Sequence, residues 1–285
     1  MKKGNVMKNV KYLVVGASGT VGSELVKILK AGGHSVRSTT SKPAQGPEVA
    51  HINLVTGEGM SAAFEGIERA FFLAPLGYAD QYKILSPLTK EATTSGLEKV
   101  VLMTGMGANA DEAAGLRRAE VELEKSGLGY NIIRPNWFLQ NFNTVFLQGI
   151  KEQGKILVPA GNAKTSFIDA KDISAVAAQL LTSDRFNNEE FDITGPQALD
   201  HDEVAKEISA VSGKTVVYQD IQPEELRKGL LGAGLPADFI ELLLTLFGFL
   251  KAGYCSRTTN SVKDILGREP RSIRDYTKEN KQAWA

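Results

Sequence analysis

Three glycines near the start of the chain form its clearest ligand-binding pattern. Gly16, Gly19 and Gly22 separate an apolar segment, residues 10–15, from a helical pattern that begins near Thr20. At this spacing one glycine permits a tight turn, one lets the backbone approach a pyrophosphate, and one lets helix and strand pack closely. The first N–H groups of a helix also attract phosphate. We therefore predict a dinucleotide site, although a glycine-rich turn that binds nothing has the same pattern. The predicted contacts are Gly16, Ser18, Gly19, Thr20, Val21 and Gly22.

The end of the next predicted strand, 36–40, distinguishes between the two nicotinamide dinucleotides. An NAD site usually has an acidic residue here that binds the ribose 2′-hydroxyl. This chain has Thr40, Ser41 and Lys42 instead, and their hydroxyls and ammonium group suit a 2′-phosphate. The sequence thus predicts NADP(H) in preference to NAD(H). Two alternatives stay open: Lys42 is an ordinary surface lysine, and Arg37 either assists or is a solvated strand residue.

The residues that follow the other predicted strands complete the cofactor site. Apolar segments over 49–54, 70–74, 100–104 and 130–134 alternate with helical patterns. In a parallel sheet, ligands bind beyond the carboxyl ends of the strands. The further predicted cofactor contacts are Asn53, Leu54, Ala74, Pro75, Leu76, Thr104, Gly105, Pro135 and Asn136.

Aromatic and amide side chains cluster after the last of these strands, in the run NWFLQNF. They can form a substrate floor beside the nicotinamide, or they can pack one part of the protein against another. Asn136 is expected to cap a helix over 137–153 in either case. The predicted substrate contacts are Tyr78, Gln81, Met106, Trp137, Phe138, Gln140 and Asn141, where Tyr78 and Gln81 form a rim or a plain loop.

Many short-chain dehydrogenases donate a proton from a Tyr that lies four residues from a Lys on the helix after the fifth strand. The corresponding segment here reads GLRRAEVELEKSG, and no Tyr occurs between Tyr82 and Tyr130. An enzyme without such an acid needs an acceptor that takes hydride readily, such as a quinone, an azo or iminium group, or a cationic dye. Binding and orientation alone can accelerate that transfer. The sequence therefore leaves the catalytic side chain, if there is one, unassigned.

Charged residues lie on the helix that lacks the Tyr–Lys pair. Glu120 and Glu124 share one helix face. Acid catalysis and an ion pair with Arg117 or Arg118 both explain them.

The histidines and the cysteine do not form a catalytic or metal-binding pattern. His34, His51 and His201 are scattered without metal-ligand spacing, so no metal site is predicted. Cys255 is expected to be a buried packing residue.

Alternating strands and helices define the fold class: α/β, a Rossmann-type doubly wound parallel sheet. We expect an NADP(H)-binding domain over 1–155, completed by about 165–195, and a smaller, mainly helical substrate-binding cap over 196–285. The substrate would lie in a cleft between the sheet edge and the cap. The expected cap elements are helices over 201–212, 223–232 and 236–251 and a strand over 215–219.

Composition narrows the range of partners. The 285 residues include 33 basic and 33 acidic side chains, so a general attraction to nucleic acid or anionic membranes is not expected. The apolar run 242–250 is too short to span a bilayer and is expected to be a buried helix. A single cysteine and a polar N-terminus without a signal-peptide core predict a cytoplasmic protein. We expect a monomer or homodimer whose partner is a small-molecule electrophile.

Several motifs together resemble the NmrA-like group of atypical short-chain dehydrogenases. They are GASGTVG, TGMGA, RAEVELEKSGL, IIRPNWFLQNF, TSFIDAKDISAVAAQLL and FDITGP, and they extend over nearly the whole chain. The resemblance implies a bilobed monomer with the cofactor across the sheet and the substrate under the cap. Two positions differ from many relatives. Ser41 and Lys42 stand where an Arg is common, and Leu116 stands where a Lys or His is often found.

Bacterial members of that group include NAD(P)H-dependent quinone oxidoreductases, azoreductases and triphenylmethane dye reductases. The combined prediction is an NADP(H)-dependent oxidoreductase that transfers hydride to a quinone, an azo compound or a cationic dye. One alternative is a redox sensor that binds NADP(H) without turnover, and another is an imine or iminium reductase. Sugar-nucleotide epimerisation is disfavoured because such enzymes keep the Tyr–Lys pair.

Overall fold

A computed structural model describes residues 12–43, 46–75 and 77–285. The chain divides into two compact units. The described residues within Met1–Pro75, Asp80–Ile133 and Ser174–Phe191 form the first, which we call the sheet unit. Leu76–Ala79, Arg134–Ile173 and Asp192–Ala285 belong to the second, the C-terminal unit, of which Leu76 is not described. The predicted division at about residue 155 and the assignment of substrate binding to 196–285 stay predictions.

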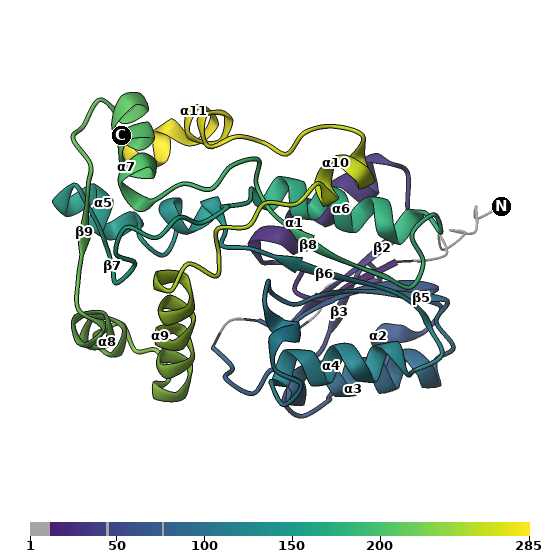
Figure 1. Cartoon of the computed structure of the whole chain (residues 1–285). Coiled ribbons are helices and arrows are strands. Elements are labelled where there is room, and N and C mark those ends of the chain that lie inside the picture. The colour runs from purple at the N-terminus through teal and green to yellow at the C-terminus, as the bar shows by residue number, and fades with distance from the viewer. Residues whose placement is uncertain (1–11, 44–45, 76) are drawn as a thin grey trace. The chain divides into compact units, whose positions relative to one another are not determined.

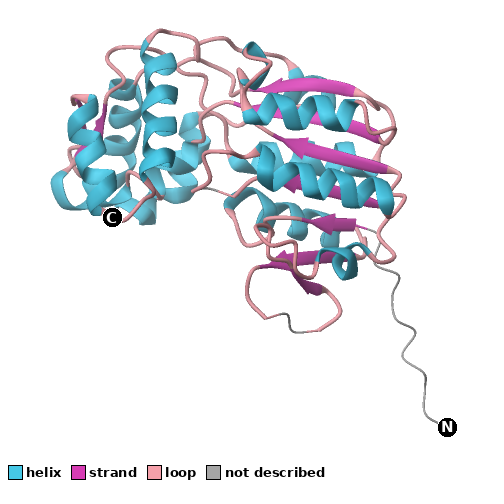
Figure 2. Cartoon of the chain, turned by 90° about the horizontal axis from the view of Figure 1, so that it is seen from below, coloured by secondary structure: helices cyan, strands magenta, loops and turns pink. Residues whose placement is uncertain are grey.

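Seven strands form one sheet in the order β3-β2-β1-β4-β5-β6-β8 (Figures 1 and 2). The pairings from β3 through β6 are parallel, and Tyr12 lies opposite both Val36 and Arg69. The chain therefore runs outward from β1 in both directions, as in a doubly wound fold. The strands are β1 Tyr12–Val14, β2 Val36–Thr40, β3 Val49–His51, β4 Arg69–Leu73, β5 Lys99–Met103, β6 Gly129–Pro135 and β8 Glu189–Ile193.

Apolar runs place the central strands in the core. Leu13, Val14 and Val15 are fully buried, and so are Phe71 and Phe72 on the neighbouring strand. Parallel strands that are covered on both faces need such continuous apolar runs rather than alternation.

Helices cover both faces of this sheet. Figure 1 shows α2, α3 and α4 along one face and α1 and α6 along the other. The Ser174 hydroxyl on α6 donates to the Val21 carbonyl on α1 at 2.9 Å and joins these two helices. The predicted Rossmann-type α/β class is confirmed. The helices are α1 Thr20–Ala31, α2 Met60–Phe64, α3 Tyr82–Thr94, η1 Ala108–Ala110, α4 Gly115–Glu124 and α6 Ala170–Thr182.

The C-terminal unit is mainly helical and has its own apolar core. Phe142, Tyr276 and Trp284 are buried there, and the Trp284 indole donates to the Phe142 carbonyl at 2.8 Å. A two-stranded parallel sheet, β7 with β9, adds to it. Its elements are η2 Leu139–Asn143, α5 Leu147–Gln153, β7 Lys155–Val158, α7 His201–Ser212, β9 Val217–Asp220, α8 Pro223–Gly232, α9 Ala237–Lys251, α10 Ser261–Leu266 and α11 Ile273–Trp284.

Residues at the N-termini of α7 and α8 favour the start of a helix. Asp200 and Glu203 form a capping box at the start of α7, and Pro223 occupies the first turn of α8. Both features stabilise a helix N-terminus independently of the rest of the fold. The helices predicted over 201–212 and 223–232 are confirmed, since α7 and α8 have these bounds.

The predicted continuous helix over 137–153 is wrong. Phe138 instead forms a parallel bridge to Ile168, in which the Ile168 N–H donates to the Trp137 carbonyl and the Leu139 N–H to the Ile168 carbonyl. These bonds keep 137–138 extended, and only η2 and the shorter α5 follow.

The helix predicted to be buried, α9, is buried on one side only. Phe247 and Leu250 lie in the core, whereas Leu246 is 39% and Phe249 is 52% exposed. Among the described residues, no helix combines the length and apolar character that a membrane crossing needs.

Candidate functional site

The glycine turn after β1 has the geometry that the sequence predicts. Gly16 has a φ of +75°, a conformation that side-chain-bearing residues rarely adopt. Its N–H donates to the Thr39 hydroxyl on β2 at 3.3 Å, so the turn is attached to the neighbouring strand. Thr39 is buried, and the sequence did not predict its bond to Gly16. Neighbouring residues of a strand point to opposite faces of the sheet. This pattern could have indicated that Thr39, unlike the half-buried Thr40, points away from solvent.

The third glycine brings α1 against the turn. A Cβ atom on Gly22 would lie 2.2 Å from the Gly16 carbonyl oxygen, so no larger residue fits there. The N-cap residue of α1 is Gly19, and the first turn of the helix contains no acidic side chain. Ser18, Gly19 and Thr20 are exposed while Val21 and Gly22 are buried. The N-terminus of α1 therefore presents backbone N–H groups and the positive end of its dipole at the surface.

The three residues predicted to bind the 2′-phosphate follow β2 in a compact turn. The Thr40 hydroxyl accepts from the Lys42 N–H at 3.1 Å, and the Lys42 carbonyl lies 3.1 Å from Nδ1 of His51. Ser41 and Lys42 are exposed. Thr40 thus shapes the backbone of this turn, and the side chain of Lys42 extends from a fixed position.

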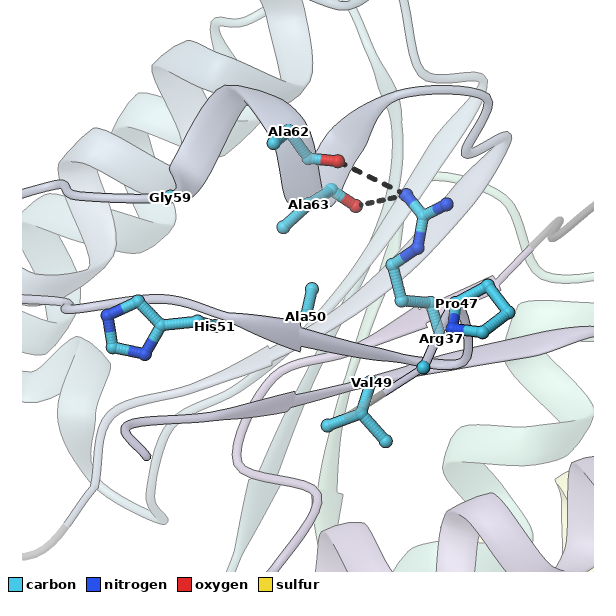
Figure 3. A pocket seen from close by; sticks show the side chains of 9 residues that line it. Arg37, Pro47, Val49, Ala50, His51, Gly59, Ala62 and Ala63 are labelled. Atoms are coloured by element: carbon cyan, nitrogen blue, oxygen red, sulfur yellow. Dashed lines mark hydrogen bonds between the residues drawn. The ribbon is translucent and has the colours of Figure 1, made fainter. Parts of the chain in front are cut away.

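Arg37, on the same strand, binds a different segment. Its guanidinium donates to the carbonyls of Ala62 and Ala63 at 3.4 and 2.8 Å (Figure 3). It also donates to the Glu65 carbonyl at 2.8 Å. These carbonyls end α2 and lack partners within that short helix, so a cation there is favourable. Arg37 is therefore not a purely solvated side chain, and its assisting role toward phosphate stays a prediction.

A shallow hollow of about 340 Å³ lies along the edge strand β3 (Figure 3). None of the predicted cofactor residues lines it. We place the candidate site at the glycine turn because the backbone there has the conformation and the free helix end that a phosphate needs. The hollow is lined by Arg37, Gly46, Pro47, Val49, Ala50, His51, Gly59, Ala62 and Ala63.

Asn53 and Leu54 follow β3 and have different surroundings. The Asn53 side-chain oxygen accepts from the N–H groups of Val55 and Thr56 at 3.0 and 3.1 Å, which closes a local turn. Leu54 packs against the core of the sheet unit. Both remain predicted cofactor contacts.

The segment after β4 is described in part. Ala74 and Pro75 are half-buried, and Leu76 lies outside the described residues. Tyr78 is exposed, and Gln81 is the N-cap residue of α3. Their predicted roles stay predictions.

The end of β5 carries a buried polar cluster. The Thr104 hydroxyl donates to Oε1 of Glu120 at 2.6 Å, and Nη1 of Arg117 lies 3.2 Å from Oε2 of the same carboxylate. Arg117 also binds Glu124 at 2.7 Å and Glu112 at 3.1 Å. Burial lowers the pKa of Arg117, but the three carboxylates outweigh burial and raise it. Of the two explanations for Glu120 and Glu124, the structure shows the ion pair.

Sequence reasoning missed the bond from Thr104 to Glu120, because it connects a strand end to a helix 16 residues later. Gly105 and Met106 follow Thr104 and are half-buried. Leu116, on the same helix as Glu120, packs against the core of the sheet unit. The guanidinium of Arg118 lies over the ring of Tyr82, 3.9 Å from its centroid.

Asn136 connects three segments rather than capping a helix. Its amide donates to the Ser166 hydroxyl at 2.7 Å and to the Cys255 carbonyl at 2.8 Å, and its oxygen accepts from the Trp137 N–H at 2.9 Å. The predicted cap role is wrong because the chain stays extended after Asn136 and the N-cap residue of η2 is Phe138. Pro135 is buried at the end of β6.

The predicted substrate residues after β6 are divided between packing and polar contacts. The Trp137 ring packs against Phe247 with centroids 4.7 Å apart and ring planes tilted by 42°, and Phe138 and Asn141 are half-buried. The Gln140 amide donates to Asp169 at 2.8 Å, and its oxygen accepts from the Ala170 N–H at 2.9 Å. Gln140 therefore stabilises the start of α6. All four remain predicted substrate contacts.

The three histidines have different neighbours: His34 packs against Tyr12, His51 lies beside the Lys42 carbonyl, and His201 packs against Phe167. Within the described ranges, no cluster of histidine, cysteine and carboxylate side chains has metal-binding geometry. Cys255 is half-buried rather than buried, and burial raises the pKa of its thiol while a hydrogen bond from Trp137 opposes that shift.

We expect the stability of the protein to fall between pH 7 and pH 5 because of His201. This side chain is 1% exposed among Phe142, Phe167 and Tyr218, and burial lowers its pKa from 6.5 to about 4. The unfolded chain takes up a proton below pH 6.5 while the folded chain does not, so stability is lost as pH falls through this range. The loss from this group is about 2 kcal/mol between pH 7 and pH 5.

Urea unfolding at both pH values measures this contribution. His201→Phe should remove about that much of the pH dependence, whereas His34→Gln, at a less buried position, should leave it intact. An unchanged pH dependence in His201→Phe would contradict the prediction.

Comparison with known proteins identifies the relatives of the chain. The NmrA-like family model matches residues 8–277. An NAD(P)H azoreductase from Xenophilus azovorans is 31% identical over 283 residues, which cover 95% of this chain and 98% of the relative. The structure is similar to a nucleoside-diphosphate-sugar epimerase from Staphylococcus aureus, at 18% identity and a TM-score of 0.81 over 94% of this chain and 100% of that chain.

It is also similar to the triphenylmethane reductase of Citrobacter sp. in complex with NADP(H), at 22% identity and a TM-score of 0.80 over 95% and 100% of the two chains. At such identities the two structures share the fold, which by itself assigns no activity. The family model and the azoreductase extend over almost the whole sequence. This chain therefore belongs to the NmrA-like family.

Proposed function

We propose that this protein is an NADP(H)-dependent oxidoreductase that transfers hydride to an electrophilic small molecule. An azo compound, a cationic dye and a quinone are the acceptor classes that suit it. The observation that carries the proposal is the glycine turn against the open N-terminus of α1, in a chain that aligns end to end with an NAD(P)H azoreductase.

The residues around the turn fit a dinucleotide. The positive φ of Gly16 and the close packing at Gly22 bring β1 and α1 together without side chains in the way. A pyrophosphate can then accept hydrogen bonds from the first N–H groups of α1. Thr40, Ser41 and Lys42 follow the adjacent strand β2, where the adenosine ribose of such a ligand lies in this fold.

The lack of a tyrosine in α4 supports the choice of acceptor. Bound NADPH supplies a hydride, that is, two electrons and one hydrogen nucleus. α4 has the sequence GLRRAEVELE, so it contains no tyrosine hydroxyl that could donate a proton. A cationic dye is neutralised by the hydride alone, and an azo compound or a quinone gains one further proton from water. Orientation by the protein then supplies much of the rate.

The substrate contacts are a further part of the proposal. We retain Tyr78, Gln81, Met106, Trp137, Phe138, Gln140 and Asn141 as candidates. Trp137 offers an aromatic surface that is fixed by Asn136 and Phe247. The cytoplasmic location and the monomeric or homodimeric state also remain predictions.

A coupled assay tests the function. Purified protein and NADPH are incubated with a panel of azo dyes, cationic dyes and quinones, and loss of nicotinamide absorbance is followed. We expect loss that depends on at least one acceptor. Tight binding of NADPH without turnover across the panel would overturn the enzymatic proposal and indicate a sensor.

We expect Lys42→Ala to weaken NADPH binding about tenfold and to leave NADH binding almost unchanged, since only NADPH has the 2′-phosphate. Isothermal titration with both dinucleotides measures the difference. Lys83→Ala is the control, because Lys83 is an exposed lysine remote from this turn in sequence that pairs with Asp80. Equal losses for the two dinucleotides would show that another group holds the phosphate.

A further inference from the structure

We infer that Thr104, held by Glu120 and Arg117, is a hydrogen-bond acceptor that positions the nicotinamide half of the cofactor. The inference rests on the proposed function and assigns roles to two charged residues that the sequence left open. Thr104 makes the contact, and Glu120 and Arg117 are positioning residues that act through it.

Backbone and side chain both fix the position of the Thr104 oxygen. The Thr104 N–H donates to the Ile133 carbonyl on β6 at 3.0 Å, which continues the sheet one residue past β5. The hydroxyl donates to Glu120 at 2.6 Å, a length typical of a strong bond to an ionised acceptor. The only hydrogen of this hydroxyl is thus committed, and the remaining capacity of its oxygen is to accept.

The surroundings of Glu120 explain why Thr104 is the donor in this hydrogen bond. Its side chain is 0% exposed on α4, where Ala119 and Leu123 are also buried. Arg117 lies one turn nearer the N-terminus of the same helix. A buried carboxylate is costly unless it is paired, and the bond to Arg117 at 3.2 Å supplies that partner. The two oxygens of this carboxylate thus accept, one from Arg117 and the other from Thr104, and Thr104 is the donor.

The strand order places Thr104 on the nicotinamide side of the turn. β2 and β3 lie on one side of β1, and β4 and β5 lie on the other. A dinucleotide with its pyrophosphate at the glycine turn and its 2′-phosphate beyond β2 extends its other half over the ends of β4 and β5. That half carries hydrogen-bond donors, namely the carboxamide N–H₂ and the ribose hydroxyls, which suit an oxygen that can only accept.

The same geometry excludes Thr104 as the proton donor to the reduced substrate. Its hydrogen is already bonded to a carboxylate, and the hydroxyl is half-buried at a fixed position. Thr104 is therefore a binding group in the reaction and not an acid.

Two ligands separate this role from a general structural one. NADPH contains both halves of the dinucleotide, and adenosine 2′,5′-bisphosphate contains only the adenosine half with its 2′-phosphate. Both are titrated calorimetrically into wild type, Thr104→Val, Thr104→Ser, Glu120→Gln and Glu124→Gln.

We expect Thr104→Val to bind NADPH about tenfold more weakly and to bind the bisphosphate as wild type does. Thr104→Ser keeps the hydroxyl and should restore NADPH binding. Glu120→Gln should weaken NADPH selectively, because an amide can turn its N–H₂ toward Thr104. Glu124→Gln removes another partner of Arg117 without touching Thr104 and should bind both ligands normally.

The outcomes separate the inference from the function on which it rests. Wild type that binds no NADPH overturns the proposed function itself. Wild-type affinity for NADPH in Thr104→Val overturns the inference alone. Equal loss of both ligands in Thr104→Val also overturns it, because the effect then extends to the adenosine half.

Discussion

Gly22→Ala is expected to abolish measurable NADPH binding and to lower the free energy of unfolding by about 3 kcal/mol. The new Cβ atom would lie 2.2 Å from the Gly16 carbonyl oxygen, 2.7 Å from the Gly16 carbonyl carbon and 2.9 Å from the Ala17 Cα. All three are backbone atoms, so no side-chain rotation relieves the contact. α1 must move away from the turn, and its N–H groups then lose their alignment toward a phosphate. Calorimetric titration with NADPH and urea unfolding measure the two effects.

Two other glycines provide matched controls for this substitution. Gly229→Ala adds the same methyl group to α8, where nothing lies within 4 Å, and alanine favours the helix by up to about 1 kcal/mol. Gly19→Ala places a Cβ atom 3.3 Å from the Gly16 oxygen and should have an intermediate effect. NADPH binding by Gly22→Ala at wild-type affinity would show that the turn does not hold the cofactor.

The turn could be predicted from sequence because its causes are local. Gly16, Gly19 and Gly22 lie within seven residues, and each has a steric reason to be glycine. The cap residues of α7 are equally local, since Asp200 and Glu203 lie one turn apart. In both cases the residues that determine the backbone are neighbours in the chain.

Contacts between distant segments explain what the sequence did not reveal. Asn136 looked like a helix cap by its position, but its partners Ser166 and Cys255 are 30 and 119 residues away. Arg37 looked like a candidate for phosphate, and the sequence did not reveal that its guanidinium binds carbonyls about 25 residues later. No periodicity or spacing rule encodes such pairs, because they follow from the packing of the complete fold.

The candidate site contains both kinds of feature, those that the local sequence predicts and those that depend on contacts between distant segments. The predicted residues at the ends of β1, β2 and β5 all belong to the sheet unit, because strand ends can be read from apolar runs. The charged support of Thr104 could not be read in this way, since Glu120 lies on a helix whose polar positions resemble a solvated face. Strand ends were thus predictable from sequence, while the orientation of their side chains required the structure.

Gly195→Ala is expected to destabilise the C-terminal unit more than any substitution at its surface. Gly195 follows β8, and a Cβ atom there would lie 1.9 Å from the Phe167 carbonyl oxygen. The Gly195 N–H donates to the Ser166 carbonyl, and the Ser166 N–H donates in turn to the Cys255 carbonyl. Separating these segments also strains the bond from Asn136 to Ser166. We expect a loss of about 3 to 4 kcal/mol.

Tryptophan fluorescence measures this effect selectively. The two tryptophans of the chain, Trp137 and Trp284, both belong to the C-terminal unit. The fluorescence melting midpoint of Gly195→Ala should fall by on the order of 10 °C. Gly248→Ala is the control, because it adds a methyl group to α9 with nothing within 4 Å and should not lower the midpoint.

A ligand for the adenosine half separates local from general damage in Gly195→Ala. The predicted contacts of adenosine 2′,5′-bisphosphate, from Gly16 to Gly22 and from Thr40 to Lys42, belong to the sheet unit. Below the lowered midpoint this ligand should therefore bind Gly195→Ala as it binds wild type. A wild-type melting midpoint would contradict the steric argument at Gly195. Loss of the bisphosphate at low temperature would instead show that the glycine turn depends on the segment around Phe167.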